Sequence, residues 1–226
     1  MSYLIVAAHP DDEVLGAGGT IHKLVSEGKD VYVCIMSGLA EARSKRPDTE
    51  SLKSDIANCM QTLNVKDVLM GTFPNIEMNT VPHLRLVQFV EEAIVKYSAD
   101  VVITHHPSDT NNDHMQTSLA VDAAVRLFQR REGVKPLKAL YYMEVPSSTD
   151  WAVNASLGKF VPNTFVEIGE EGIEKKINAL SQYDGVMRDY PHPRSVEALR
   201  GLAAVRGAQA GRMYAEAFQC VFNTEI

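Results

Sequence analysis

The sequence is poor in cysteine and in long apolar runs. Its three cysteines, Cys34, Cys59 and Cys220, are scattered and form no C-x-x-C pair, which argues against a disulfide framework or a thiolate zinc site. No apolar stretch approaches the roughly 20 residues that a membrane span requires. The first apolar run is also too short for a secretory signal, and it ends in acids. These features predict a reduced, cytoplasmic protein without a membrane span.

Basic residues are in the minority. The chain has 22 Lys and Arg against 29 Asp and Glu, a net charge of −7. Nucleic acids and anionic membranes bind basic surfaces, so the charge balance predicts neither as a partner. An anionic substrate stays open, because the local cluster of Arg43, Lys45 and Arg46 could meet one. The ordinary globular composition and the length of 226 residues predict one domain over residues 1–226.

The chain does contain a regular alternation of apolar runs and helical patterns. The apolar runs that predict strands are residues 4–8, 31–36, 68–71, 101–105, 139–143 and 164–167. Helical spacing is found at residues 14–26, 50–63, 84–97 and 114–131, and again at Ile173, Ile177 and Leu180. This alternation predicts an α/β fold with a mostly parallel sheet and helices on both faces. The last third, about residues 146–226, contains long irregular stretches typical of substrate-side loops.

Residues that can carry chemistry follow the first apolar run. Residues 3–8 lead into His9-Pro10-Asp11-Asp12-Glu13, and then into Gly16-Ala17-Gly18-Gly19. An apolar run without alternation is typical of a buried parallel strand, and the proline cannot continue its ladder. Ligand sites of open α/β sheets lie just beyond the carboxyl ends of the strands. One imidazole and three carboxylates are therefore concentrated where a site is expected.

A second polar cluster follows the fourth apolar run. His105-His106-Pro107 ends this run, and Asp109-Thr110-Asn111-Asn112-Asp113-His114 comes soon after. Neighbouring parallel strands end at the same edge of a sheet, so both clusters can converge on one cation. A catalytic zinc commonly takes three protein ligands and leaves a position for water, and a nearby carboxylate can act as the general base. These residues alone do not rank Asp11 against Asp12 as the ligand.

The run Ala8-His9-Pro10-Asp11-Asp12-Glu13, with the glycines behind it, resembles the signature of the PIG-L/LmbE-like zinc-dependent de-N-acetylases. The resemblance implies a Rossmann-like fold and removal of the acetyl group from an N-acetylglucosamine-type sugar or sugar conjugate. It also implies that His9, Asp12 and His114 bind one Zn²⁺ and that Asp11 is the general base. Other divalent ions such as Fe²⁺ suit the same ligands. Related proteins form trimers or hexamers, so a homo-oligomer is expected.

One position departs from the family pattern. Many members carry a histidine three residues before the matched ligand, where this chain has Asn111. Asparagine can donate a hydrogen bond to an oxyanion, but it cannot supply a proton at neutral pH. His192, in Tyr190-Pro191-His192-Pro193-Arg194, is a candidate for the missing role. The alternative is a loop histidine without a catalytic part.

Substrate-binding candidates follow from the same resemblance. Ser37 follows the second strand, where the family places a loop near the sugar, and Lys53 matches a region where members often carry an arginine. Asn75 stands in a loop where relatives often have an acid, and Arg206 belongs to a segment that resembles the closing motif of the family. Arg194, beside His192, completes the set. These substitutions suggest a substrate different from those of the best-known members.

Two other interpretations remain open. In a nucleotide-binding module, the run Gly16-Ala17-Gly18-Gly19 would hold phosphates, but it lacks the G-x-G-x-x-G spacing and follows an acid-rich turn. The chain could instead be a metal-binding but catalytically weak or inactive relative that acts as a binding protein. Asn111 favours this second interpretation, whereas Asp11 argues against it.

Overall fold

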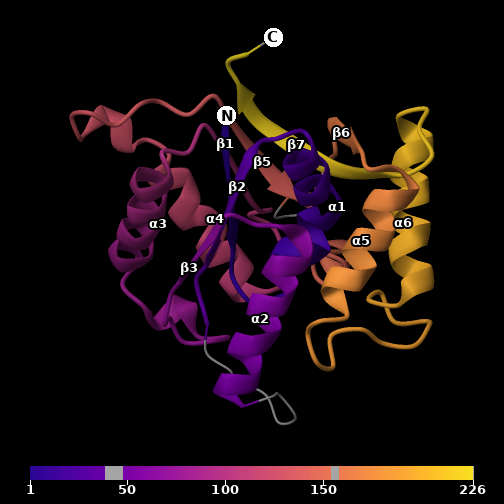
Figure 1. Cartoon of the computed structure of the whole chain (residues 1–226). Helices are drawn as coiled ribbons and strands as arrows, with labels where there is room; N and C mark the ends of the chain where they lie inside the picture. The colour runs from indigo at the N-terminus through magenta and orange to yellow at the C-terminus, as the bar shows by residue number, and fades with distance from the viewer. Residues whose placement is uncertain (39–47, 154–157, 226) are drawn as a thin grey trace.

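The computed structural model describes residues 1–38, 48–153 and 158–225 of the chain, so Arg43, Lys45 and Arg46 lie outside the described residues. A sheet with the strand order β3-β2-β1-β4-β5-β7-β6 passes through these residues (Figure 1). Its strands are β1 (Ser2–Ala7), β2 (Asp30–Ile35), β3 (Asp67–Met70), β4 (Val101–His105), β5 (Ala139–Met143), β6 (Thr164–Glu167) and β7 (Ala215–Asn223). β1 to β5 pair in parallel, and β7 is antiparallel to both of its neighbours. The predicted α/β fold with a mostly parallel sheet is confirmed.

The helices cover both faces of this sheet (Figure 1). They are α1 (Asp12–Ser26), α2 (Thr49–Leu63), α3 (His83–Tyr97), α4 (Asn112–Ala124), α5 (Gly169–Leu180) and α6 (Val196–Gln209). Short 3₁₀ turns are η1 (Met78–Thr80), η2 (Leu127–Gln129) and η3 (Thr149–Trp151). α3 and α4 lie on one face, and α1, α2, α5 and α6 lie on the other. No helix among these residues is both long and apolar enough to cross a membrane.

β1 lies in the middle of the sheet, between β2 and β4. Leu4 and Val6 pack in the core beneath α3 and α4, whereas Ile5 packs in the core beneath α1, α2 and α5. Because both faces of the strand are buried, its sequence is an unbroken apolar run. Val6 pairs with Thr104 of β4, so the loops that leave the two strands start side by side. The predicted convergence of the two polar clusters is confirmed.

Some elements differ from those predicted. The helix predicted over residues 114–131 ends at Ala124, and the chain then tightens into η2. Backbone N–H groups of Gln129 and Arg130 bond to carbonyls three residues earlier, which is the 3₁₀ pattern and not the α-helical one. α6 and β7 are present although the apolar pattern predicts neither.

α1 is interrupted in its middle. Ala17 has a non-helical backbone conformation, with φ of −145° and ψ of 15°. The break deprives the carbonyl of Leu15 and the N–H groups of Gly19 and Thr20 of their partners within the helix. Buried backbone groups must find other partners, because leaving them unpaired destabilises the fold.

A buried ion pair supplies these partners. Nζ of Lys176, on α5, donates to the carbonyl of Leu15 at 2.8 Å and to Oε1 of Glu216, on β7, at 2.6 Å. The carboxylate of Glu216 in turn accepts the N–H groups of Gly19 at 3.0 Å and Thr20 at 2.7 Å. Both charged side chains are buried. The pair therefore joins α1, α5 and β7 through the polar groups that the helix break exposes.

The glycine run of α1 serves close packing. A Cβ atom on Gly16 would lie 2.5 Å from Sδ of Met143, and one on Gly19 would lie 2.6 Å from Cδ1 of Ile168. Both distances are too short for a side-chain atom, so α1 approaches β5 and the residue before α5 only because these positions lack side chains. This packing accounts for the glycines without a bound nucleotide.

Candidate metal centre and active site

A cavity of about 420 Å³ lies at the edge of the sheet where β1 and β4 end. Eight of the site residues predicted from the sequence line it: His9, Asp11, Asp12, Asn75, Asn111, His114, His192 and Arg194. The other lining residues are Ile76, Ser147, Ser148, Asp184, Gly185, Val186 and Arg188. The structure therefore brings together loops that are far apart in the chain, including the two long irregular stretches of the last third.

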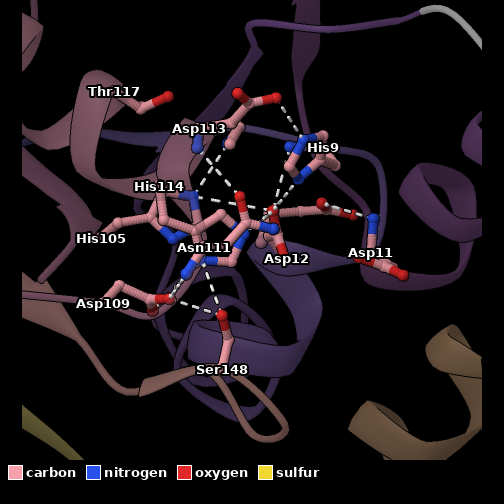
Figure 2. Close-up of polar contacts among 12 residues, drawn as sticks. His9, Asp11, Asp12, His105, Asp109, Asn111, Asp113, His114, Thr117 and Ser148 are labelled. Carbon is pink, nitrogen blue, oxygen red and sulfur yellow. Dashed lines mark hydrogen bonds and ion pairs between the residues drawn. The ribbon is translucent and has the colours of Figure 1, made fainter. Parts of the chain in front are cut away.

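The predicted metal ligands meet in this cavity. Oδ2 of Asp12, at the start of α1, lies 3.1 Å from Nδ1 of His9 and 3.0 Å from Nε2 of His114 (Figure 2). His9 belongs to the loop after β1, and His114 lies in the first turn of α4. All three side chains are buried, and their potential ligand atoms lie within 4.8 Å of one another. Two imidazole nitrogens thus face one carboxylate oxygen.

Each histidine is held at its other nitrogen by a further carboxylate (Figure 2). Nε2 of His9 lies 3.0 Å from Oδ2 of Asp113, and Nδ1 of His114 lies 3.1 Å from Oδ2 of Asp109. Metal-binding histidines usually have such a partner, because it fixes the ring orientation and directs the opposite nitrogen to the ion. The donor set and its supporting carboxylates therefore fit a divalent cation.

The charges of the cluster also favour a cation. Burial opposes the charged form of His114, but the carboxylates of Asp12 and Asp109 outweigh it and raise the pKa of this histidine to about 10. Burial also opposes ionisation of Asp12, but His114 and His9 hold the pKa of its carboxyl well below the usual range. Three buried carboxylates, counting Asp113, thus surround two imidazoles. The cluster attracts positive charge into its centre.

A second group of possible ligands, His105, Asp109 and His114, is less suited to a metal. Nε2 of His105 already accepts the backbone N–H of Ala8 at 2.8 Å. The ring also stacks on His114 with a centroid separation of 3.9 Å. Burial lowers the pKa of His105 to about 3, so this histidine is neutral. His105 therefore packs against the ring of His114 and helps to hold its orientation.

Asp11, the predicted general base, lies beside the predicted metal ligands and is held from two sides. Oδ2 accepts a hydrogen bond from Nη1 of Arg194 at 2.9 Å, and the Nε of this arginine donates to Oγ of Ser147. The backbone of Asp11 has a φ of 107°, which few residues other than glycine adopt. Its N–H donates to Glu13, whose other carboxylate oxygen accepts from the hydroxyl of Tyr183 at 2.7 Å.

Asn111 is the N-cap residue of α4, directly before the helix begins at Asn112. Its Oδ1 accepts the N–H of Asp113 at 2.9 Å and so caps the helix. Its backbone N–H donates to Asp109, which also accepts hydrogen bonds from the hydroxyls of Ser148 and Thr149. With the oxygen used by the cap, the amide nitrogen is the remaining polar group that Asn111 offers to the cavity.

His192 lines the cavity from an exposed loop. Its Nδ1 accepts the backbone N–H of Arg194 at 3.0 Å, which leaves Nε2 as the nitrogen that carries the proton in the neutral ring. Partial burial and the charges of Arg194 and Arg188 lower the pKa of this histidine. His192 is therefore placed to donate a hydrogen bond from Nε2 to a molecule in the cavity.

The structure does not bring the other three predicted substrate residues to the cavity lining. Ser37 is fully buried, and its hydroxyl has no hydrogen-bond partner among the described residues. Lys53 lies on the exposed face of α2 and pairs with Glu50 at 2.8 Å. Arg206 forms a two-pronged ion pair with Glu144, which occupies its guanidinium.

Sequence reasoning missed several residues that build the site. Asp109 and Asp113 were visible in the second polar cluster, but their roles depend on which histidine nitrogen each one faces. Ser147, Ser148 and Arg188 lie in the irregular stretches, where no pattern singles them out. Only proximity in the fold identifies them.

Comparisons with known proteins identify a family and a shared fold. The family model of GlcNAc-PI de-N-acetylase, PIG-L, matches residues 4–125, which include both polar clusters. A conserved protein from Thermus thermophilus is similar over 99% of this chain and 96% of its own, with 23% identity and a TM-score of 0.81. The 4-carboxy-2-hydroxymuconate hydratase from Pseudomonas putida is similar over 100% and 98%, with 20% identity and a TM-score of 0.79. The N,N'-diacetylchitobiose deacetylase from Pyrococcus horikoshii is similar over 97% of this chain and 83% of its own, with 19% identity and a TM-score of 0.74. At these identities the likeness to solved structures shows a shared fold.

Proposed function

The chain belongs to the PIG-L (GlcNAc-PI de-N-acetylase) family, and from this premise we propose that it hydrolyses the acetamide group of an N-acetyl sugar or sugar conjugate. The observation that carries the proposal is the group of His9, Asp12 and His114 next to Asp11 in one cavity. The products would be acetate and a free amine. The hydrolysis would use activated water and no covalent intermediate.

Each residue of the site has a part in this proposal. His9, Asp12 and His114 would hold zinc, which when bound lowers the pKa of a coordinated water to roughly 7 and polarises the amide carbonyl. Asp11 takes the proton of the attacking water, and Arg194 orients its carboxylate at 2.9 Å. Asn111 and His192 act on the groups that change charge.

Asn111 and His192 serve the later part of the reaction. The amide nitrogen of Asn111 donates to the oxyanion that develops when water adds to the carbonyl. The proton that Asp11 takes from water would pass to the departing amine, and His192, whose Nδ1 accepts the backbone N–H of Arg194, would donate a hydrogen bond from Nε2 to the leaving nitrogen. Asn111 thus stabilises charge without moving a proton, and the leaving group is bound by a residue of the last third of the chain.

The metal site gives a direct prediction. Protein purified without added metal or affinity-tag histidines is expected to hold about one zinc per chain. Replacing His114 by Ala removes one of the three ligands, so this variant is expected to lose the zinc. Metal content measured by mass spectrometry tests this, with His22→Ala as the control because His22 pairs with Glu171 away from the cavity. A chain that stays free of divalent metal after zinc is resupplied would refute the proposed hydrolysis.

The Asn111→Asp variant separates oxyanion stabilisation from helix capping. Asp caps helices as well as Asn does, so the melting temperature is expected to stay unchanged. The carboxylate cannot donate a hydrogen bond, so kcat is expected to fall by roughly 10²–10³-fold. Asn178→Asp adds the same charge at an exposed position of α5, outside the cavity lining, and is the matched control. Equal kcat values for both variants would count against the assigned role.

A second candidate reaction is the addition of water to a carbon–carbon double bond of an unsaturated carboxylate. Asn111 favours it, because hydration releases no amine and needs no acid for one. The Pseudomonas putida hydratase shares the fold, so the fold accommodates this reaction. Amine release from acetylated sugars and loss of the ultraviolet absorbance of a conjugated dienoic acid distinguish the two. Bound zinc without either activity would indicate the binding protein considered from the sequence.

A further inference from the structure

The cavity wall formed by residues 185–194 contributes two arginines to the lining. Arg188 and Arg194 both line the cavity, and His192 lies between them in the chain. The backbone N–H of Arg188 donates to the carbonyl of Arg194 at 3.3 Å, which closes this loop. The side chains of Arg188 and Arg194 therefore start from neighbouring points of the backbone. Their fields overlap at His192, whose pKa both arginines lower.

The two arginines differ in what they bind. Arg194 is committed within the protein, since it donates to Asp11 and Ser147. Arg188 is exposed, and its side chain has no hydrogen-bond or ion-pair partner among residues 1–38, 48–153 and 158–225. The cavity acids Asp11 and Asp12 are already engaged by Arg194 and the histidines. Asp184, the remaining acid of the lining, makes no ion pair with Arg188.

We propose that Arg188 binds an anionic group of the substrate, a carboxylate or a phosphate, close to the acetamide that is cleaved. A guanidinium offers several N–H donors in a planar fork that matches the oxygens of these groups. In a chain with a net charge of −7, such a wall also attracts an anion to this cavity locally. The substrate would then be an acidic N-acetyl sugar conjugate. This identification rests on the proposed function, whereas the anion site itself does not.

Turnover of matched substrates tests the proposal. The zinc-loaded enzyme is assayed for amine release from N-acetylglucosamine, N-acetylglucosamine 1-phosphate and N-acetylmuramic acid, which are neutral, phosphorylated and carboxylated. We expect a higher kcat/KM for one of the two acids, and which one identifies the anionic group. Arg188→Gln is expected to lower the ratio of acidic to neutral kcat/KM by roughly 10–100-fold, since hydrogen bonds to charged groups are worth this much. Arg188→Lys should restore part of the ratio.

The control is Arg126→Gln, which removes one exposed positive charge outside the cavity lining. It is expected to leave the ratio as in the unchanged protein. An equal ratio in Arg188→Gln and Arg126→Gln would overturn the anion site, as would a preference for the neutral sugar. A ratio that falls in both variants would show a general effect of net charge and would also overturn it.

A binding measurement separates this proposal from the proposed function. Isothermal titration calorimetry compares N-acetylglucosamine 1-phosphate with N-acetylglucosamine on the zinc-loaded protein. Tighter binding of the phosphate that is lost in Arg188→Gln, and that weakens with added salt, would support the anion site even if no sugar is cleaved. Equal affinities for both sugars would overturn the anion site even if the neutral sugar is cleaved.

Discussion

An Asp11→Asn variant is expected to keep its zinc and to lose about 10²–10⁴-fold in kcat. Asn has the shape of Asp, and it tolerates the positive φ that Asp11 adopts better than most residues do. Its amide oxygen can still accept the hydrogen bond from Arg194. The variant therefore keeps the geometry of the site but cannot take a proton from water. Amine release, zinc content and melting temperature are measured on the same preparation.

The matched control for this variant is Asp184→Asn. Asp184 also lines the cavity, but it is exposed and has no part in the proposed reaction. Its replacement is expected to change kcat by less than about threefold, as is usual for a group outside the chemistry. Undiminished turnover in Asp11→Asn would exclude this residue as the base. Loss of zinc together with turnover would instead give Asp11 a role in holding the metal.

Lys176→Met is expected to lower the free energy of unfolding by roughly 3–5 kcal/mol, because it leaves the buried charge of Glu216 without its partner. The carbonyl of Leu15, freed by the break in α1, also loses its donor. For a chain of this length the change corresponds to a fall in melting temperature of roughly 6–20 °C. Chemical and thermal denaturation measure it, in chelator and with zinc, because bound metal adds its own stabilisation.

Lys53→Met provides the comparison for this effect. The same substitution there breaks an ion pair with Glu50 in which the two side chains are 61% and 82% exposed. Exposed pairs contribute little, so the expected loss is below about 1 kcal/mol. If the two variants lost the same stability, the ion pair of Lys176 and Glu216 would have no special role in filling the break of α1.

The sheet was largely predictable because its central strands, β1, β2 and β4, are mostly buried and read as apolar runs. α6 was not, because its buried positions are Leu199, Ala203 and Gly207, and small residues give no apolar stripe at helical spacing. β7 was not predicted for a different reason. Glu216 is buried in it, and a charged residue within the first four positions hides the strand pattern.

The centre of the site was predictable from the resemblance and the outer parts were not. His9, Asp12 and His114 stand in motifs whose spacing is visible in the sequence, and the structure brings them together. Lys53 and Arg206 followed from position along the chain, which does not tell whether a helical side chain faces a cavity. The acid that engages Arg206 is 62 residues away in the sequence, so only the fold reveals the pair.

The ion pair that fills the break in α1 has a consequence for how the chain is made. The N–H groups of Gly19 and Thr20 precede their acceptor, Glu216, by 197 and 196 residues. A ribosome adding about 5–20 residues per second synthesises the acceptor roughly 10–40 s after the helix. Throughout this interval the N–H groups of Gly19 and Thr20 in the nascent helix lack their acceptor. The amino-terminal half carries most of the reactive residues, yet we expect it to reach its folded structure only when the final strand, β7, emerges.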